Sequence, residues 1–216
     1  MVEKINREDW ENDFNFIQLY TKKLKDKIVW PEHWTEAKLS QNLLGEGYKV
    51  LDVGASAGHA YHAFKEHGCG YYLGVDIIEK LIDIGNEYWK DDDRCELKWM
   101  DVAKGIEVDE AFDVIILNTV IAHVIDWKKL LRDCNSVLKR GGYIMIRESV
   151  TKGETKRWAK KESAYNDNVH YFTHWYTNFN IDELREFFTK DLDMNVVKDH
   201  INPGPNYWFF AIRKKE

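Results

Sequence analysis

A short glycine-containing turn between two apolar runs constrains this chain more than any other feature. The sequence V-L-D-V-G-A-S-A-G occupies residues 50–58, and a second apolar run, Y-Y-L-G-V over 71–75, ends in Asp76. Because glycine has no Cβ, the backbone can bend tightly at such a turn and approach a ligand closely. A carboxylate at the tip of the next strand can accept hydrogen bonds from ribose hydroxyls. The two features together predict a pocket for a cofactor that carries a nucleoside.

The spacing of the glycines separates this turn from other nucleotide-binding turns. Dinucleotide sites use G-x-G-x-x-G, and P-loops add a lysine. Here the order is D-x-G-x-x-x-G, from Asp52 through Gly54 to Gly58, with Ser56 in between and no such lysine. The pattern resembles motif I of the class I S-adenosylmethionine-dependent methyltransferases, over roughly residues 45–150. The resemblance implies a Rossmann-like, doubly wound α/β fold with a mostly parallel seven-stranded sheet and a C-terminal antiparallel hairpin.

Composition limits the classes of function. The 216 residues carry a formal net charge of −6, which disfavours long nucleic acid as a substrate. We find no signal-peptide pattern and no apolar stretch of the ~18–20 residues that a membrane span needs, so we expect a cytoplasmic protein with no membrane association. Three scattered cysteines indicate free thiols, and no spacing typical of metal ligands is present, so no metal is expected.

The chain reads as one domain over 1–216, in four parts. Residues 1–44 look helical, 45–150 form the cofactor core, 151–180 are a substrate lid, and 181–216 hold a helix and antiparallel strands. Apolar strands that alternate with amphipathic helices predict βαβ units and a parallel sheet. The expected strands are 48–53, 71–76, 95–100, 112–118, 142–148, 194–200 and 207–213, and the expected helices are 35–44, 57–67, 79–89, 126–138 and 182–189, with Gly141-Gly142 as a helix C-cap.

The resemblance assigns cofactor contacts along the strand ends. Asp76 is expected to bind the ribose, with Ile77 against one face of the adenine, and Asp101 to accept from the adenine amine. Asp52 is expected either to organise the turn and contact the ammonium group of the cofactor, or only to cap the loop without contacting the cofactor. The full set of predicted cofactor-binding residues is Asp52, Gly54, Ser56, Gly58, Asp76, Ile77, Asp101, Val102, Asn118 and Thr119.

A histidine follows the fourth strand. In open α/β sheets, ligands bind beyond the carboxyl ends of the strands, so the turn after Asn118 and Thr119 faces the reacting sulfur. An imidazole there can remove a proton from a hydroxyl or amine near neutral pH. His123 is therefore a candidate base, although the family resemblance also allows it to contact only the cofactor.

The fifth strand carries two charged residues at its tip. The run G-G-Y-I-M-I-R-E-S over 141–149 is similar to a segment of phosphoethanolamine (phosphobase) N-methyltransferases, and 168–176 loosely resembles their substrate loop. The loop lacks that family's R-x-x-x-F-Y order, so the similarity is local. It makes Glu148 a second catalytic candidate, and it places Arg147, His170, Tyr171, His174 and Tyr176 at the substrate.

These observations favour transfer of a methyl group from S-adenosylmethionine to an O or N atom of a small metabolite, such as a phosphorylated amine, by a monomer or homodimer. A protein or nucleic acid methyltransferase remains open, as does a non-catalytic domain that only binds the cofactor. The glycine spacing disfavours an NAD-dependent oxidoreductase.

Overall fold

We describe the protein from a computed structural model, which describes residues 14–163, 171–201 and 207–216. The described part begins with helices α2 (Phe14–Lys25) and α3 (Pro31–Leu44) and then alternates strands and helices. The bounds of the elements that follow are β1 Lys49–Val53, α4 Tyr61–Glu66, β2 Tyr71–Asp76, α5 Glu79–Trp89, β3 Cys95–Trp99, β4 Phe112–Asn118, η1 Ile121–His123, α6 Trp127–Val137, β5 Leu138–Thr151, β6 Lys156–Ser163, β7 Tyr171–Asn180, α7 Ile181–Glu186, η2 Phe187–Asp191, β8 Met194–Ile201 and β9 Tyr207–Lys214.

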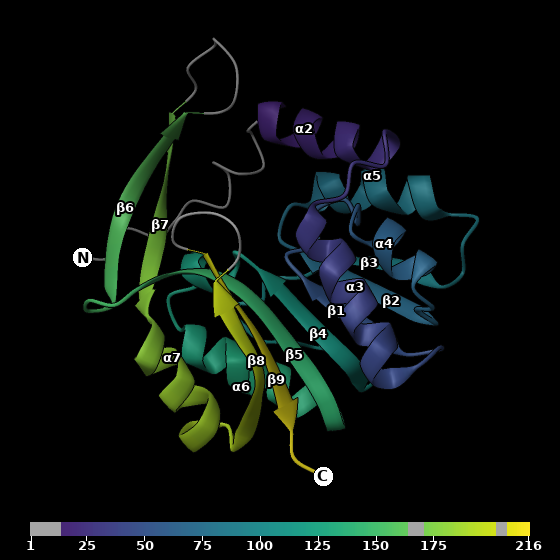
Figure 1. The fold of residues 1–216 in the computed structure, drawn as a ribbon. Helices are drawn as coiled ribbons and strands as arrows, with labels where there is room; N and C mark the ends of the chain where they lie inside the picture. Colours follow the sequence, from purple (N-terminus) through teal and green to yellow (C-terminus); the bar gives the residue numbers. More distant parts are fainter. Residues whose placement is uncertain (1–13, 164–170, 202–206) are drawn as a thin grey trace.

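The main sheet is doubly wound and mostly parallel. Strands β3, β2, β1, β4 and β5 pair in that order, all parallel, and β9 then adds antiparallel to β5, with β8 antiparallel to β9. The predicted fold class is confirmed, including the antiparallel strands at the C-terminus. Because these five strands are parallel, their carboxyl ends lie at one edge of the sheet, and α2 lies over that edge at the top of Figure 1.

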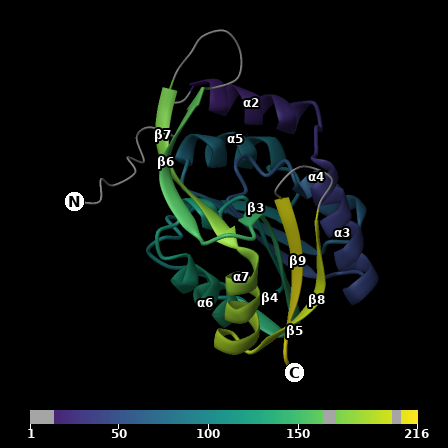
Figure 2. The ribbon, with the colours of Figure 1, turned by 60° about the vertical axis from the view of Figure 1, so that its left-hand side comes forward.

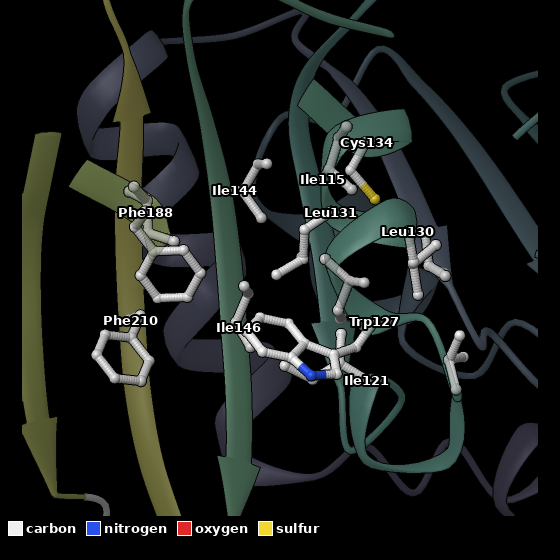
Figure 3. Close-up of a cluster of buried hydrophobic side chains, with 14 of the residues drawn as sticks. Ile115, Ile121, Trp127, Leu130, Leu131, Cys134, Ile144, Ile146, Phe188 and Phe210 are labelled. Atoms are coloured by element: carbon white, nitrogen blue, oxygen red, sulfur yellow. The ribbon is translucent and has the colours of Figure 1, made fainter. Parts of the chain in front are cut away.

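Alternating side chains of each buried strand divide the core between two faces of the sheet. On one face, Val50, Val114 and Met145 pack with α3, α4 and α5; on the other, Leu51, Ile115 and Ile146 pack with α6 and α7. Figure 3 shows the second core, in which Trp127 and Leu131 of α6 lie beside Ile144 and Ile146 of β5. Because side chains alternate along β5, Arg147 and Glu148 project to opposite faces.

The sequence analysis predicts residues 151–180 as a substrate lid but assigns them no secondary structure. Here β6 and β7 pair as an antiparallel hairpin, and Val150 and Thr151 at the end of β5 join it to the sheet. The hairpin projects beyond the edge where the parallel strands end (Figures 1 and 2). Its role as a lid remains a prediction.

Several predicted boundaries are wrong, each for a local reason. The helix expected at 57–67 is α4, which begins only at Tyr61 because residues 54–60 continue the turn. Gly141 and Gly142 lie inside β5 and do not cap α6, which ends at Val137. The helix expected at 35–44 begins at Pro31, because proline fits the first position of a helix without losing a hydrogen bond.

Candidate functional site

A cleft of about 220 Å³ opens beyond the carboxyl ends of β1, β4 and β5. The motif turn, the ends of β4 and β5, and the two N-terminal helices with their connection all contribute to its walls. The lining residues are Tyr20, Trp30, His33, Asp52, Gly54, Ala55, Ser56, His59, Asn118, Thr119 and Arg147. The structure therefore brings together six of the predicted residues, which are Asp52, Gly54, Ser56, Asn118, Thr119 and Arg147.

The glycine turn forms one wall through its backbone. Gly54 has φ +80° and Ser56 has φ 51°, a left-handed conformation that is uncommon for a residue with a side chain. The amides of Gly54 and Ala55 donate to the carbonyl of Val75 at 2.8 and 3.1 Å, which ties the turn to the end of β2. A Cβ on Gly54 would lie 2.5 Å from Cγ2 of Val120, so only glycine fits here without displacing the chain after β4.

Asp76 holds the same turn from the tip of β2. Its Oδ2 accepts from the amide of Ser56 at 2.8 Å, and its Oδ1 accepts from the amide of Ile78 at 2.9 Å. Burial raises the pKa of Asp76, although these backbone donors oppose the shift. Its hydrogen-bond partner Ser56 lines the cleft, so the carboxylate lies next to the cleft. Each carboxylate oxygen keeps a further lone pair for a ligand.

Asp52 lies at the floor of the cleft and is almost fully buried. The hydroxyl of Tyr72, on the neighbouring strand, donates to its Oδ2. Burial raises the pKa of Asp52 to about 6, because neither His33 nor the Tyr72 hydrogen bond compensates fully for lost water. A positively charged group in the cleft would stabilise its ionised form.

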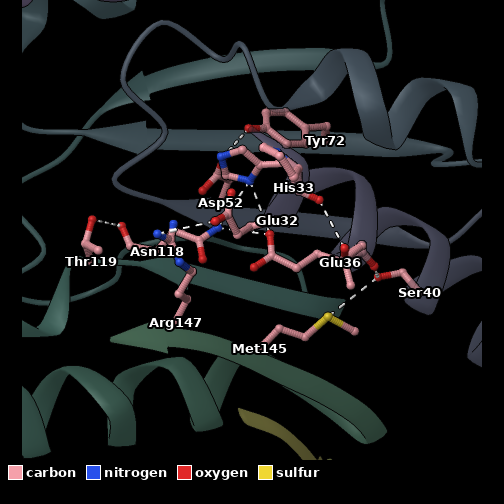
Figure 4. A network of polar contacts seen from close by, with 12 residues as sticks. Glu32, His33, Glu36, Ser40, Asp52, Tyr72, Asn118, Thr119, Met145 and Arg147 are labelled. Atoms are coloured by element: carbon pink, nitrogen blue, oxygen red, sulfur yellow. Dashed lines mark hydrogen bonds and ion pairs between the residues drawn. The ribbon is translucent and has the colours of Figure 1, made fainter. Parts of the chain in front are cut away.

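A polar network from α3 forms the opposite wall (Figure 4). The Nδ1 atom of His33 lies 3.2 Å from Oε2 of Glu36, and the amide nitrogen of Asn118 donates to that same oxygen at 2.9 Å. Burial lowers the pKa of His33, but the hydrogen bond and charge of Glu36 outweigh it, so the pKa is raised overall. Arg147 pairs with Glu32 of the same helix at 3.4 Å.

Thr119 occupies a strained backbone position on this wall. Its φ is 58°, and a β-branched residue in this region is a genuine conformational outlier. Its amide donates to the carbonyl of Arg147 at 2.8 Å, and its hydroxyl donates to the carbonyl of Asn118 at 2.7 Å. Strain of this kind, typically about 1–3 kcal/mol, concentrates at binding sites.

The two predicted catalytic residues lie away from the cleft lining. The ring of His123, at the end of η1, packs edge-on against Tyr176 of β7 at 5.5 Å. Glu148 is fully buried on the α6 face, where its Oε1 accepts from the amide of Ala122 at 3.2 Å. Burial raises the pKa of Glu148 to about 8, so its carboxyl is mainly protonated at neutral pH.

The remaining predicted residues are dispersed. Ile77 is partly buried against α5, Val102 packs against the core on the α6 face, and Asp101 forms an ion pair with Lys104 at 3.2 Å. A Cβ on Gly58 would meet the side chain of Leu97 at 3.0 Å, inside the protein. His170 lies outside the described residues, and Tyr171 and His174 fall on β7 where the described part of the structure covers the backbone alone.

Sequence reasoning missed five residues of the lining. One is Ala55, inside the glycine turn, and the other four are Tyr20, Trp30, His33 and His59. None of these four belongs to a recognised spacing, and three come from the N-terminal helical segment that was predicted without a role. The one sequence signal that could have pointed to Tyr20, Trp30 and His33 is that the segment before the first strand contains aromatic residues and a histidine. Within the described residues, we find no cluster of three His, Cys, Asp or Glu side chains placed to hold a metal ion.

The sequence matches a family model described as a methyltransferase domain over residues 44–199. The chain belongs to this methyltransferase family. Its membership confirms the resemblance to class I S-adenosylmethionine-dependent methyltransferases on which the glycine turn was interpreted. S-adenosylmethionine is the cofactor expected of this family.

Curated relatives align with about half of the chain. It is 34% identical over 113 residues to the ribosomal protein L11 methyltransferase of Thermotoga petrophila, covering 51% of this chain and 40% of that protein. It is 28% identical over 109 residues to the ubiquinone biosynthesis O-methyltransferase of Coxiella burnetii, covering 50% and 46%. The aligned region spans less than half of each relative's length.

Solved structures agree over nearly the whole chain. A methyltransferase from Clostridium acetobutylicum superposes with a TM-score of 0.67 at 14% identity, covering 93% of this chain and 98% of that one. The 1,6-didemethyltoxoflavin-N1-methyltransferase of Burkholderia thailandensis gives a TM-score of 0.64 at 19% identity, covering 94% and 88%. At such identities the likeness establishes the fold. No helix within the described ranges is both long and apolar enough to cross a membrane.

Proposed function

We propose that this protein transfers the methyl group of S-adenosylmethionine to an O or N atom of a small metabolite. The observation that carries the proposal is the cleft at the strand ends, where a glycine turn held by Asp76 faces a network of buried polar side chains. The family membership supports the cofactor, and similar solved structures include complexes with S-adenosylmethionine or S-adenosylhomocysteine.

The residues present fit this cofactor. Gly54 leaves space that a Cβ could not share with Val120, so a ligand can lie against the turn. Buried acceptor atoms without a hydrogen-bond partner in the described structure, Oε1 of Glu36 and Oδ1 of Asn118, suit a bound ammonium group. Asp52 adds a carboxylate on the same side. Asp76 would bind the ribose, with Ile77 and Asp101 further toward the adenine.

The bound cofactor would supply the electrophilic methyl group on a sulfonium. The protein must then orient the acceptor and, for a hydroxyl, remove its proton. We place the base at His33, because it lines the cleft and Glu36 orients its Nδ1, which leaves Nε2 for the acceptor. A pKa raised by Glu36 suits a base that works near neutral pH. His123 stays the second candidate, with Glu148 as a residue that holds the η1 backbone.

The acceptor is the least defined part of the proposal. Arg147 lines the cleft and can form bidentate contacts with a phosphate or carboxylate, which keeps small phosphorylated amines among the acceptors to test. Protein methylation is a second candidate, favoured by the match to L11 methyltransferases. We expect a monomer or homodimer, which size-exclusion chromatography with light scattering would determine.

Calorimetric titration with S-adenosylhomocysteine and, separately, with NAD tests the cofactor. We expect binding of S-adenosylhomocysteine and no binding of NAD, and preference for NAD would reject the proposal. Methylation of phosphoethanolamine, a hydroxylated aromatic metabolite and a purified L11 protein would then distinguish the acceptor classes. Binding without turnover on any acceptor would support a non-catalytic domain.

A further inference from the structure

A buried lysine lies beside the cleft, with no carboxylate partner among the described residues. Lys23 of α2 is 6% exposed, although lysine is almost never buried unless it is paired. Its Nζ lies 3.8 Å from the ring centroid of Trp30 and 4.6 Å from that of Tyr20, and both rings line the cleft. No acidic side chain in the described ranges forms an ion pair with it. Burial lowers the pKa of Lys23 to about 8.

A buried histidine lies next to the same two helices. His59 is 5% exposed and lines the cleft, and neither of its ring nitrogens has a hydrogen-bond partner in the described structure. Its ring lies 5.3 Å from that of Tyr20 and 5.4 Å from that of His33. Burial and then nearby positive charge, including Lys23, hold the pKa of His59 well below its usual value. The neutral ring therefore has one N–H to donate.

The described residues leave these two groups incompletely satisfied. A buried polar atom without a partner is destabilising, and cation–π contacts compensate only in part for burying the charge of the lysine. The other two basic side chains of the cleft each contact a carboxylate, since Arg147 contacts Glu32 and His33 contacts Glu36. Lys23, which contacts the lining, and His59, which belongs to it, are thus a cationic group and a donor group that a ligand anion would complete.

We propose that Lys23 and His59 form an anion subsite that binds a carboxylate or phosphate group of a ligand seated in the cleft. Lys23 supplies the charge, Trp30 and Tyr20 hold its side chain, and His59 donates one N–H to the same anion. Asp52 lines the cleft, and the buried Glu36 lies behind the lining residues His33 and Asn118, so a ligand with separated charges is bound in one orientation. The anion belongs either to the cofactor's amino acid carboxylate or to the methyl acceptor, and this inference rests on the proposed function.

The test compares Lys23→Met with Lys25→Met, which removes an exposed lysine from the same helix. Calorimetry measures binding of S-adenosylhomocysteine and of 5′-methylthioadenosine, which lacks the amino acid group. If Lys23 binds the cofactor carboxylate, Lys23→Met weakens S-adenosylhomocysteine about 10- to 100-fold, the loss expected for one charge-assisted hydrogen bond, and leaves 5′-methylthioadenosine unchanged.

The second arm tests an acceptor anion. The melting temperature of protein saturated with S-adenosylhomocysteine is measured with inorganic phosphate or malonate against chloride at equal ionic strength. If the subsite serves the acceptor, these anions protect the wild type and Lys25→Met but not Lys23→Met, and Lys23→Arg restores protection. Where Lys23→Met does not fold, His59→Gln and Lys23→Arg carry both measurements.

Unchanged affinity for S-adenosylhomocysteine together with unchanged anion protection in the Lys23 and His59 variants would overturn the subsite. A wild type that binds no S-adenosylhomocysteine would instead reject the proposed function. The anion arm would still decide the subsite in that case, with unliganded protein.

Discussion

Two walls face each other across the cleft, and they are built by different means. The motif wall, residues 52–58 with Asp76, presents backbone amides and a turn that only glycine can make at position 54. The helical wall, residues 20–36 on α2 and α3, presents side chains: a lysine between aromatic rings and a histidine held by a glutamate. The difference shows that the motif wall, on which the family resemblance rests, depends on the local conformation of a few neighbouring residues. The part that would select the acceptor depends on packing between distant segments.

The largest expected effect tests the motif wall at Asp76. We expect Asp76→Ala to weaken S-adenosylhomocysteine binding by about 100-fold or more, because the ribose contact and the acceptor for the Ser56 amide are both lost. Calorimetry measures the change, and Asp76→Asn serves as the control that keeps the side-chain shape. Near-normal affinity in the alanine variant would remove Asp76 from the ribose site.

The next prediction asks which wall holds the base. We expect His33→Asn to lower kcat by about 100-fold or more while S-adenosylhomocysteine still binds, because a positioned base contributes on that scale. Glu36→Gln should lower kcat less, since it leaves the imidazole in place. His123→Ala is the matched comparison, measured on whichever acceptor is turned over. A large loss in His123→Ala with none in His33→Asn would move the base to the turn after β4.

A pair of glycines separates steric fit from backbone freedom. Gly54→Ala places a Cβ 2.5 Å from Val120, whereas Gly45→Ala, at a similar positive φ, meets nothing within 4 Å. Both variants should lose about 1 kcal/mol of unfolding free energy to backbone strain. Only Gly54→Ala should also weaken S-adenosylhomocysteine, by about tenfold or more, since the turn must shift. Equal affinities in the two variants would show that the turn does not touch the ligand.

Glu148 gives a pH dependence that belongs to neither wall. Its pKa of about 8 in the fold, against 4.5 for an ordinary glutamate, means that the folded state holds a proton which the unfolded state releases. Its contribution to stability is therefore complete below about pH 4.5 and is lost as the pH rises through about 8, with a slope of up to about 1.4 kcal/mol per unit. Relative to the wild type, Glu148→Gln should gain stability toward pH 8 in urea titrations. Parallel curves for the two proteins would contradict a buried protonated carboxyl.

The smallest effect concerns strain beside the motif wall. Thr119→Gly should raise the unfolding free energy by about 1 kcal/mol, because glycine adopts a φ of 58° without a Cβ penalty. Lys27→Gly, at a φ of 55° outside the cleft lining, is the control and should gain similarly. We expect ligand affinity to change only in Thr119→Gly. A stabilised Thr119→Gly with unchanged affinity would make the strain incidental to binding.

The core of the fold was predictable because its signals are local. The predicted ranges 71–76, 79–89 and 112–118 coincide with β2, α5 and β4, where apolar periodicity is strong and the ends carry polar residues. The helix expected from 57 fails because backbone turns with φ above zero at Ser56 and Gly58 extend the motif loop. The β6–β7 hairpin has no comparable pattern in β6, where charged residues prevail.

The site divides in the same way. Asp52, Gly54 and Ser56 are found from spacing alone because the turn dictates its own residues. The opposite faces taken by Arg147 and Glu148 follow from strand alternation, but which face meets the cleft depends on where α3 packs. The sequence predicts His123 as a candidate base from its place after β4, whereas the structure places His33 in the lining of the cleft beyond the ends of β4 and β5.

The sequence by itself determined the alternating strands and helices, the glycine turn and the carboxylate at the tip of β2, since each depends on residues a few positions apart. Only the tertiary structure decided that Glu36 meets Asn118, 82 residues away, and that Lys23 lies against Trp30 beside His59. The physical reason is that backbone conformation is set by near neighbours. The contacts of a buried charged side chain are set by how whole helices pack on the sheet.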